Sequence, residues 1–573
     1  MIDATRGDLL ALAIVPGRFA AVATASGSSV VLPAIAPDGR DLMQQLELIE
    51  AELAPRWVIW SNDTASVLVA SGLRLARCWD LAAVHRLLFG GWRADPARIW
   101  ARLADLSVGS IPALAAVDLF SAVVPDDELG EPIGADGHVR PEWTNGAWTE
   151  SADRLGRWAT LAMTVAGLQL ERLRSTSAAL RSEATARSES AAELLCAELS
   201  ADGLPVDRAI AEQIIGSYIG PRPRTDAEGL EQRARRDAEV LRHVPDVGHV
   251  DLRSPGQVKS LLRGVGIEVP DTRAWRLEAL RETHPLVDSL LVWRKAERVA
   301  TTYGYGWLDT HVDADGRLRG AWSGSDGAAG RMTASAGLHN LPADLRGAVV
   351  AETGHVFVRA DLGQIEPRVL AAVSGDASLA AATQADDMYE PVARQLGVDR
   401  ATAKVAVLGA MYGQTTGHGA QALQRLNAAY PVAMAYLQQA DQAAQVSQDL
   451  RTYGGRRVEM SFTNANEVSD REARSRAAAR GRYGRNALVQ GAAAEFFKVW
   501  AVTVRARAAA FDARIVLCLH DELLVHAPAA HGGAVAALVD ECLQESASRW
   551  APDGTVRFLA DTTVLRCWAD AKS

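Results

Sequence analysis

The sequence predicts a multidomain α/β protein, and three observations indicate this class. The chain has 573 residues, which is too long for a single core and favours about three or four domains. Its composition, with 48% hydrophobic and 23% charged residues, is typical of soluble globular proteins. Short apolar runs alternate with helical stretches over residues 1 to about 170, and two later apolar strands each end in an acid, Asp361 and Asp521.

Composition and the N-terminal sequence also indicate in which cellular compartment the protein is expected. The five cysteines are scattered without a C-x-x-C pair, so neither a zinc site nor a disulfide framework is indicated. No stretch approaches the ~20 apolar residues of a membrane span. The N-terminus, M-I-D-A-T-R-G-D, has acids where a signal peptide has bases. We therefore expect a cytoplasmic protein, monomeric and without a membrane partner.

The formal net charge of −10 argues at first against a nucleic-acid partner, because phosphate binding rests on lysine and arginine. Basic residues are nevertheless concentrated locally. A run of arginines lies within fifteen residues, at Arg471, Arg474, Arg476, Arg480, Arg482 and Arg485. In isolation such a run indicates a solvated helix face. Here it leads directly into N-A-L-V-Q, residues 486 to 490, which favours a functional surface.

The middle of the chain is predicted to be largely helical. An Ala-, Ser- and Glu-rich passage begins near residue 177, and L-R-S-P-G-Q-V-K-S-L-L follows at 252 to 262. Pro255 directly after Ser254 predicts a helix N-terminus, because proline is tolerated in the first helical turn. A basic helix, R-K-A-E-R-V-A-T-T-Y, is predicted at 294 to 303. No internal repeat or low-complexity segment is present.

Two acids at strand ends are the first candidate site. V-F-V-R-A-D, residues 356 to 361, reads as a strand ending at Asp361, and R-I-V-L-C-L-H-D-E-L-L-V reads as a hairpin with Asp521 near its turn. Adjacent strands would bring both carboxylates to the same metals. Two Mg²⁺ ions held by two aspartates are the minimum for two-metal phosphoryl transfer. Alone, an H-D-E triplet beside an apolar run is more often an ordinary turn.

A helix between these strands carries matching cations. In R-A-T-A-K-V-A-V-L-G-A-M-Y-G, residues 400 to 413, Arg400, Lys404, Leu408 and Tyr412 recur every four positions and share one face. Arginine and lysine suit triphosphate oxygens. The alternative is an amphipathic surface helix with chance bases. Gly409 is unfavourable in that alternative, because a mid-helix glycine costs about 1 kcal/mol relative to alanine.

Taken together, D-L-G-Q-I-E-P-R (361 to 368), the 400 to 413 helix and L-H-D-E-L-L-V (519 to 525) resemble motifs A, B and C of family A DNA polymerases, the bacterial DNA polymerase I type. Their order along the chain also agrees, and the resemblance extends over roughly residues 190 to 573. It implies a right-hand polymerase preceded by an exonuclease-like (RNase H-like) α/β domain, in a Klenow-like chain without the 5′ nuclease. The implied domains are 1–175 (exonuclease-like), 176–315 (thumb and connecting helices), 316–378 (first part of the palm), 379–505 (fingers) and 506–573 (second part of the palm).

The resemblance also implies roles for individual residues. The implied catalytic residues are Asp361, Asp521, Glu522 and Lys404. The implied ligands of the two Mg²⁺ ions are Asp361, Asp521 and the Leu362 backbone carbonyl. Glu366 matches the steric gate that excludes ribonucleotides. The implied nucleotide-binding residues are Arg400, Lys404, Leu408, Tyr412, Gln364, Glu366, Leu362 and Tyr389, and the implied DNA-binding residues are Arg331, Arg368, Arg456, Arg482, Asn486, Gln490 and His520.

Several positions depart from the family pattern. Leu362 replaces a tyrosine, Gly363 a serine and Pro367 a leucine, and Leu408 lacks the usual aromatic ring. Tyr389 stands where D-I-H is usual, because this chain reads D-M-Y. We expect altered nucleotide affinity and a reshaped turn after motif A.

The first 175 residues match the family only faintly. W-D-L-A-A-V-H-R-L-L, residues 79 to 88, resembles a helix of the 3′-5′ exonuclease fold, but no D-x-E occurs in the first forty residues. An alignment to the last exonuclease motif puts Trp158 and Ala162 at its two key positions. Asp63 and Asp80 remain, too few for a two-metal centre. We expect a structural domain without proofreading activity.

The leading hypothesis is a template-directed DNA polymerase that adds dNTPs to a primer 3′ end, with primer-template DNA as its partner and roles in DNA replication or repair. Two alternatives stay open. A single-subunit RNA polymerase shares the carboxylates and the lysine-tyrosine helix, whereas Glu366 and the H-D-E triplet favour DNA. A catalytically impaired DNA-binding protein is the other, given the departures at Leu362, Gly363, Tyr389 and Leu408.

Overall fold

The computed structural model describes residues 2–36, 38–114, 130–176, 178–244, 248, 250–326, 329–413, 419–460, 470–519 and 521–572. The chain divides into two compact units, each built from three segments. The first unit is Met1–Asp202, Ala321–Ala334 and Gly354–Val564, and the second is Gly203–Gly320, Ser335–Thr353 and Leu565–Ser573.

An α/β layer opens the first unit, as the alternation of apolar runs predicted. Its five strands lie in the order β3-β2-β1-β4-β5. β1, β2 and β3 are antiparallel, whereas β4 runs parallel to both β1 and β5. The elements are β1 (Leu9–Val15), β2 (Phe19–Thr24), β3 (Ser29–Pro33), α1 (Arg40–Leu53), β4 (Arg56–Ile59), α2 (Asn62–Ala70), β5 (Cys78–Asp80), α3 (Leu81–Phe89), α4 (Pro96–Leu103), α5 (Pro141–Thr144) and α6 (Ala152–Arg174).

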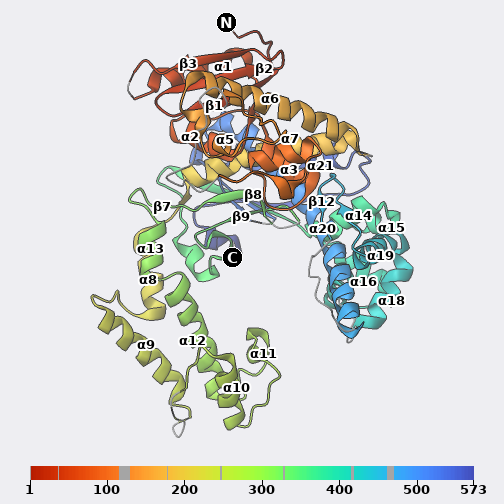
Figure 1. Ribbon diagram of the computed structural model, residues 1–573. Helices are drawn as coiled ribbons and strands as arrows, with labels where there is room; N and C mark the ends of the chain where they lie inside the picture. Colours follow the sequence, from red (N-terminus) through yellow and green to blue (C-terminus); the bar gives the residue numbers. More distant parts are fainter. Residues whose placement is uncertain are drawn as a thin grey trace. The chain divides into compact units, whose positions relative to one another are not determined.

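β1 is a continuous apolar run because both faces of its sheet are covered. Leu10 and Leu12 enter one buried cluster with residues of α1 and α2. Ala11 and Ala13 point the other way, into a second cluster with Trp60 and α6. Helix α6 crosses β1, β2 and β3 on that second face (Figure 1).

Helix α7 (Ala179–Asp202) also belongs to the first unit, although the sequence analysis grouped residues 176–315 together. It packs against α2, α3, β5 and β8, and against the long helix α20 (Asp470–Ala508). Glu189 and Glu193 of α7 are buried at 2% exposure each, so the second half of this helix lies inside the first unit. The five predicted domain boundaries stay a prediction.

A four-stranded sheet in the order β13-β14-β10-β15 carries the acids singled out in the sequence. β10 pairs antiparallel with β14, and β13 and β14 form a hairpin. Helices α20 and α21 pack together, and α21 lies on β10 and β14. The bounds are β8 (Trp322–Asp326), β9 (Arg331–Ala334), β10 (His355–Leu362), β13 (Arg514–Leu519), β14 (Glu522–Pro528), α21 (Gly532–Trp550) and β15 (Ala560–Leu565).

A group of helices between β10 and β13 surrounds the first half of α20 (Figure 1). Helices α14, α17 and α19 each pack against α20. The elements are α14 (Ile365–Ser374), α15 (Ala377–Ala382), α16 (Tyr389–Leu396), α17 (Arg400–Tyr412), α18 (Gly419–Ala429), α19 (Pro431–Gln445), β11 (Leu450–Arg451) and β12 (Arg457–Val458).

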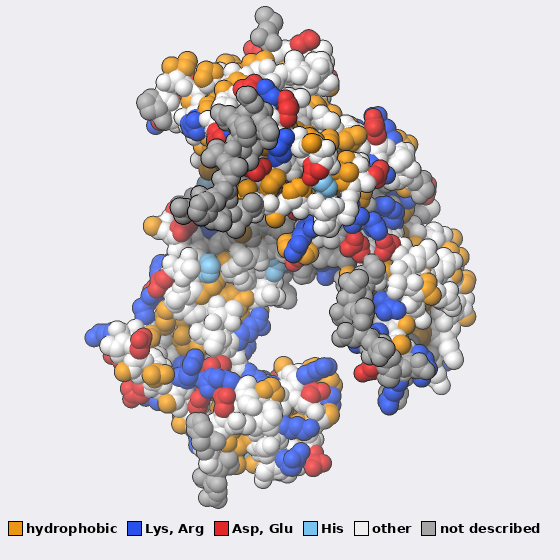
Figure 2. Space-filling model, viewed as in Figure 1, with side chains coloured by type: hydrophobic (Ala, Val, Ile, Leu, Met, Phe, Trp, Pro, Cys, Tyr) orange, Lys and Arg blue, Asp and Glu red, His pale blue; other side chains and the backbone are white. Residues whose placement is uncertain are grey.

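Among the described residues, one helical stretch, Arg471–Phe511, is long and apolar enough to cross a membrane. This corrects the expectation that no stretch reaches such apolarity. Because 78% of its most apolar window is buried inside the protein, the apolar character is accounted for by packing of α20 in the core. Acidic and basic side chains are interspersed over the face drawn in Figure 2.

The second unit is mainly helical, as predicted. Helix α10 begins at Pro255 with Ser254 as its N-cap residue, so the predicted helix start is confirmed. Leu261, Leu286 and Trp293 are among the residues of its apolar core. Its elements are β6 (Leu204–Pro205), α8 (Arg208–Ile219), α9 (Asp226–Leu241), α10 (Pro255–Gly264), α11 (Ala274–Glu278), α12 (Pro285–Thr302), α13 (Tyr305–His311) and β7 (Arg317–Leu318).

Candidate active site

Two aspartates meet at the ends of adjacent strands, as the sequence predicted. Asp361 lies at the end of β10 opposite Glu522, the first residue of β14. The Leu362 N–H donates to the Asp521 carbonyl oxygen at 2.8 Å, which ties the two strand ends together. Burial and the nearby charge of Asp521 raise the pKa of Asp361 to about 6, and burial with Glu522 raises the pKa of Asp521. Acidic charge is therefore concentrated here.

Arg359, which the sequence analysis did not single out, lies among these acids. It occupies β10 two residues before Asp361, so both side chains lie on one face of the sheet. Its guanidinium pairs with Asp361, with Glu522 at 2.8 Å and with Asp561 at 3.4 Å, while the residue is only 5% exposed. The signal was an arginine inside an apolar strand, V-F-V-R-A-D, where a buried cation requires carboxylate partners.

We expect the Arg359→Ala variant to bind divalent cations more tightly than the wild type in the absence of nucleotide. The guanidinium neutralises carboxylates that a divalent cation would also bind. Because the variant lacks this positive charge at contact distance, we expect its affinity for the divalent cation to rise at least about fivefold. Titration calorimetry with Mn²⁺ measures this directly. Weaker Mn²⁺ binding would instead mean that Arg359 holds the acids in their binding arrangement.

A cavity of about 430 Å³ opens beside the two aspartates. It gathers side chains from the strand ends and from β9, α14, α16, α17 and α20, all within the first unit. A volume of this size suits a small-molecule ligand. The predicted site residues that line it are Arg331, Asp361, Leu362, Gln364, Glu366, Tyr389, Arg400, Lys404, Leu408, Tyr412 and Asp521.

Glu366 is held by two neighbours on the cavity wall. The Tyr412 hydroxyl donates to one carboxylate oxygen at 2.6 Å, and Arg331 Nη2 donates to the other at 2.8 Å. Gln490 also hydrogen-bonds the Tyr412 hydroxyl. Burial and the Glu366 contact raise the pKa of Tyr412 to about 12, so its hydroxyl keeps its proton at neutral pH. The position of the carboxylate is thus set by both α17 and β9.

Asp387 connects the turn after β10 to helix α17, and the sequence analysis did not identify it. Gln364 Nε2 donates to Asp387 Oδ1 at 2.7 Å, while the Arg400 guanidinium pairs with the other carboxylate oxygen. The Met388 N–H donates to Gln364 Oε1 at 2.9 Å. Asp387 is the acid of the D-M-Y segment, from which the sequence analysis selected only Tyr389 as a site residue. The position of Asp387 in that segment could therefore have identified it.

Helix α17 presents its cations to the cavity, and capping residues fix where the helix begins and ends. The Asp399 side chain accepts the Thr402 N–H at the N-cap, and Gly413 ends the helix with φ of 69°. A Cβ at Gly413 would lie 2.7 Å from Arg482 Cγ, so helix α20 also requires glycine there. Lys404 is exposed and pairs with no carboxylate among the described residues. Its ammonium is therefore available to an anion.

Two departures from the family pattern have structural reasons. A Cβ at Gly363 would approach Leu559 Cδ1 to 2.4 Å, so Leu559 fills the space that a serine side chain would need. Pro367 lies in the first turn of α14, where its missing N–H removes no intrahelical hydrogen bond. Pro367 therefore does not interrupt α14, and a reshaped turn before this helix stays a prediction.

The predicted DNA-binding side chains of α20 lie on one helix at four-residue spacing. Arg482 is exposed, whereas Asn486 and Gln490 are half-buried. The carbonyl oxygen of the Asn486 side chain is buried without a hydrogen-bond partner among the described residues. DNA contact by these side chains stays a prediction. His520 lies outside the described residues.

Two residues predicted to bind DNA are instead buried structural groups. Arg368 has 0% exposure, and its guanidinium donates to five backbone carbonyls, at Gly363, Thr383, Ala385, Asp386 and Arg557, over 2.6 to 2.9 Å. Arg456 is 3% exposed and pairs with Glu189 at 2.5 Å. Burial of both side chains argues against DNA contact, which stays a prediction, because a single sequence does not distinguish an inward-pointing arginine from an exposed one.

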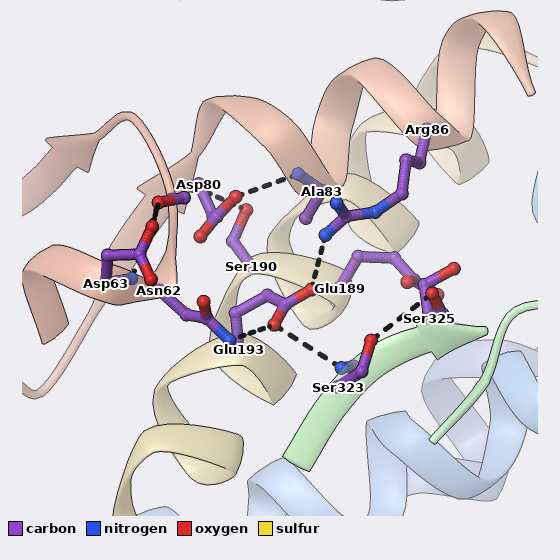
Figure 3. Close-up of polar contacts among 12 residues, drawn as sticks. Asn62, Asp63, Asp80, Ala83, Arg86, Glu189, Ser190, Glu193, Ser323 and Ser325 are labelled. Carbon is purple, nitrogen blue, oxygen red and sulfur yellow. Dashed lines mark hydrogen bonds and ion pairs between the residues drawn. The ribbon is translucent and has the colours of Figure 1, made fainter. Parts of the chain in front are cut away.

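Asp63 and Asp80, the two acids considered as remnants of a nuclease site, do not form a site together. Asp80 is fully buried and caps α3 by accepting the Ala83 N–H at 2.8 Å, while its own N–H donates to Ser190 (Figure 3). Asp63 is exposed in the first turn of α2. Beyond them Glu193 pairs with Arg86 at 2.7 Å and accepts from Asn62 at 2.8 Å (Figure 3). These acids are used in structural contacts.

Comparisons with known proteins identify the family of this chain. A family model described as DNA polymerase family A matches residues 226–570, more than half of the chain. The chain belongs to DNA polymerase family A. The family resemblance inferred from three sequence motifs is thereby confirmed.

Among relatives of this family A chain, thermostable DNA polymerase I of Thermus aquaticus is 32% identical over 354 residues, which are 55% of this chain and 42% of that protein. The Thermus thermophilus enzyme is 32% identical over 303 residues, 48% of this chain and 36% of the relative. DNA polymerase theta of Caenorhabditis elegans is 25% identical over 407 residues, 65% of this chain and 23% of the relative. The chain thus spans less than half the length of these relatives.

A solved structure shares the fold over nearly the whole chain. The POL domain of Pol1 from M. smegmatis, in a complex with DNA primer-template and dNTP, superimposes with a TM-score of 0.70 and 21% identity. The match covers 98% of this chain and 96% of that chain. The family A polymerase fold predicted from the sequence is therefore confirmed.

Proposed function

We propose that this protein is a template-directed DNA polymerase that adds dNTPs to the 3′ end of a primer paired with template DNA. The observation that carries the proposal is the single cavity in which Asp361 and Asp521 face Arg400 and Lys404. Acids on one side and cations on the other, of which Lys404 pairs with no carboxylate among the described residues, suit a nucleotide triphosphate whose α-phosphate is attacked by a hydroxyl. Membership of family A supports the same reaction.

The donor set fits Mg²⁺. Asp361 and Asp521 offer hard carboxylate oxygens at adjacent strand ends, and their raised pKa values reflect an excess of negative charge that a dication would relieve. Two such ions, when bound, would activate the primer hydroxyl and neutralise charge on the leaving pyrophosphate. A contribution of the Leu362 carbonyl to ion binding is part of this proposal.

The remaining cavity residues bind and orient the substrate. Arg400 presents a planar fork to phosphate oxygens once Asp387 releases it, and Lys404 contacts the leaving pyrophosphate and can supply its proton. Tyr412 lies two turns beyond Lys404, toward the templating base. Leu408 offers no aromatic ring to the incoming sugar, so Glu366 is the main group available for sugar selection.

Extension of a labelled primer on a DNA template with Mg²⁺ tests the proposal, with dNTPs and NTPs offered separately beside an Asp521→Ala control. We expect extension with dNTPs and none in the variant. Primer-template binding without extension would favour the impaired DNA-binding protein. Equal use of NTPs would favour an RNA polymerase.

We expect the Glu366→Ala variant to incorporate NTPs much more readily than the wild type. The carboxylate is fixed by Tyr412 and Arg331, so it cannot swing away from the sugar 2′ position. Removing it opens space for a 2′ hydroxyl, which we expect to raise the ratio of NTP to dNTP incorporation by about 100-fold, or ~3 kcal/mol of discrimination. Competing single-nucleotide incorporations measure the ratio, and an unchanged ratio would remove Glu366 from sugar selection.

We further propose that the N-terminal layer is an exonuclease-like domain without proofreading. Trp60 and Trp158 stack with ring centroids 4.6 Å apart, and Trp143 and Trp148 lie 6.0 and 6.2 Å from Trp158. These rings and Ala162 occupy the α6-covered face of the sheet, where the aligned motif would supply metal-binding side chains. An apolar cluster of this kind binds no metal ion.

We expect a primer with a mismatched 3′ end to stay intact when incubated with the protein, Mg²⁺ or Mn²⁺ and no dNTPs. Gel analysis of a 5′-labelled primer detects loss of a single nucleotide. An Asp361→Asn protein is the matched control, because it separates polymerase-site pyrophosphorolysis from hydrolysis. Metal-dependent shortening abolished by Asp80→Ala would contradict the proposal.

The thumb, palm and fingers boundaries, a monomeric state, a cytoplasmic location and a role in gap filling or lesion tolerance belong to the same proposal. The likeness to a polymerase domain over 98% of the chain supports the domain arrangement. A polymerase without proofreading, as proposed here, is better suited to synthesis of short stretches than to replication of long templates.

A further inference from the structure

The first unit contains a second cavity, of about 480 Å³, that shares no lining residue with the polymerase cavity. It lies among β4, the segment before β5, and helices α7, α20 and α21. Seven of its lining side chains are arginines, and Glu545 is its one lining carboxylate. We call it the arginine cavity, defined by Arg56, Arg77, Arg181, Arg187, Arg505, Arg507 and Arg549.

Four of these arginines are neutralised by carboxylates. Arg187 pairs with Glu183 at 2.5 Å, and Arg505 with Glu198 at 2.7 Å. Arg507 and Arg549 share Glu545, at 3.2 and 2.6 Å, and Arg507 also pairs with Glu541 at 2.7 Å. Each of these four arginines thus has its own carboxylate partner.

The other three arginines have no carboxylate partner among the described residues. Arg56 Nη1 donates to the Cys78 carbonyl at 3.2 Å, and Arg77 donates to the Ala54 carbonyl. Arg181 lies over the Tyr453 ring, 4.0 Å from its centroid, and reaches the carbonyl of the same residue at 3.5 Å. Three of the seven arginines of the cavity therefore lack a direct ion pair among the described residues.

This excess charge is unfavourable in the protein alone. Burial, together with the like charges of Arg187 and Arg77, lowers the pKa of Arg56. Arg77 and Arg181 are exposed and only Arg56 is half-buried, and three guanidinium groups lining one cavity favour a multivalent anion. The cluster contrasts with the net charge of −10 of the whole chain, so it does not follow from a generally basic surface.

The chemistry of the walls indicates phosphate. Guanidinium forks bind phosphate oxygens through two parallel hydrogen bonds, better than they bind a spherical anion. Trp550, at 6% exposure, lines the cavity with Val499 and Val502 and supplies an apolar side for a nucleoside or a sugar. We propose that the arginine cavity binds an oligophosphate, either the backbone of single-stranded DNA or a free polyphosphate, independently of the polymerase cavity.

Titration calorimetry on the full chain tests this with inorganic tripolyphosphate as the probe. The background is Arg400→Ala/Lys404→Ala, which removes the cations of the polymerase cavity so that remaining binding reports the arginine cavity. We expect 1:1 binding in this background. Adding Arg56→Gln and Arg181→Gln should weaken it at least about tenfold, because two charged phosphate contacts are lost.

Arg174→Gln is the matched control, because Arg174 is an exposed arginine at the end of α6 outside the cavity, and it should leave the affinity unchanged. Thermal melting without ligand should show no loss of stability in the Arg56→Gln/Arg181→Gln variant, since repulsion is relieved. No binding in the background protein, or equal weakening by Arg174→Gln, would overturn the proposal.

A second arm separates the two sources of phosphate. A short oligodeoxythymidylate that binds more tightly than tripolyphosphate, and loses that binding with Arg56→Gln/Arg181→Gln, assigns the site to single-stranded DNA. Tripolyphosphate binding with no oligonucleotide binding assigns it to a free polyphosphate. Primer extension by the otherwise wild-type Arg56→Gln/Arg181→Gln protein, measured in parallel, keeps this outcome distinct from any failure of the proposed polymerase function.

Discussion

The Asp361→Asn variant is expected to extend a primer at least about 10³-fold more slowly than the wild type in single-turnover incorporation of one dNTP. The substitution is nearly isosteric but removes one of the two strand-end carboxylates that converge on the cavity. Metal-assisted charge stabilisation contributes several kcal/mol to transition states of this kind. Each 1.36 kcal/mol corresponds to about tenfold in rate.

Two controls make this result interpretable. Primer-template affinity, measured by fluorescence anisotropy, should be unchanged, because Asp361 is not among the cationic groups that contact phosphate. Mn²⁺ binding without nucleotide should weaken in the same variant. A variant rate within about tenfold of wild type would contradict the assignment of Asp361 as a metal ligand.

The Arg368→Met variant is expected to lose about 4 kcal/mol or more of unfolding free energy. Methionine retains much of the apolar stem but leaves five backbone carbonyls, one of them at buried Thr383 and the others partly buried, without their shared donor. Each buried group left unsatisfied costs about 1–3 kcal/mol. These carbonyls belong to the turn after β10 and to segments near residues 383–386 and 557, so the loss should loosen the wall of the active-site cavity.

Urea denaturation followed by circular dichroism measures this loss. Arg394→Met is the matched control, because Arg394 is an exposed arginine of neighbouring helix α16, and it should change stability by less than about 0.5 kcal/mol. At a temperature where Arg368→Met stays folded, its DNA affinity should equal that of the wild type. Reduced DNA affinity with unchanged stability would restore the original prediction that Arg368 binds DNA.

Local sequence pattern was sufficient to predict the position of site residues where a motif has a regular spacing. Spacing of four placed Arg400, Lys404, Leu408 and Tyr412 on one helix face, and all four line the cavity. An apolar run ending in an acid located Asp361 and Asp521. The start of α10 at Pro255 followed from the limited positions that proline accepts in a helix.

Local sequence pattern did not predict whether a side chain points into the protein or toward solvent. Arg368 and Arg456 have the same residue type as Arg482, yet the first two are buried and the third is exposed. Arg359 joins acids from β14 and β15, and Asp387 joins α14 to α17. Such pairings depend on which distant strands and helices become neighbours.

By itself, the sequence determined the family, the paired carboxylates and the cationic face of α17, because each follows from residue type and local spacing. Tertiary structure alone decided that Arg359 lies among the strand-end acids, that Arg368 is a buried scaffold group and that seven arginines from five segments share one cavity. The physical reason is that burial and charge pairing arise between residues up to hundreds of positions apart, and only the packed chain brings them within hydrogen-bonding distance.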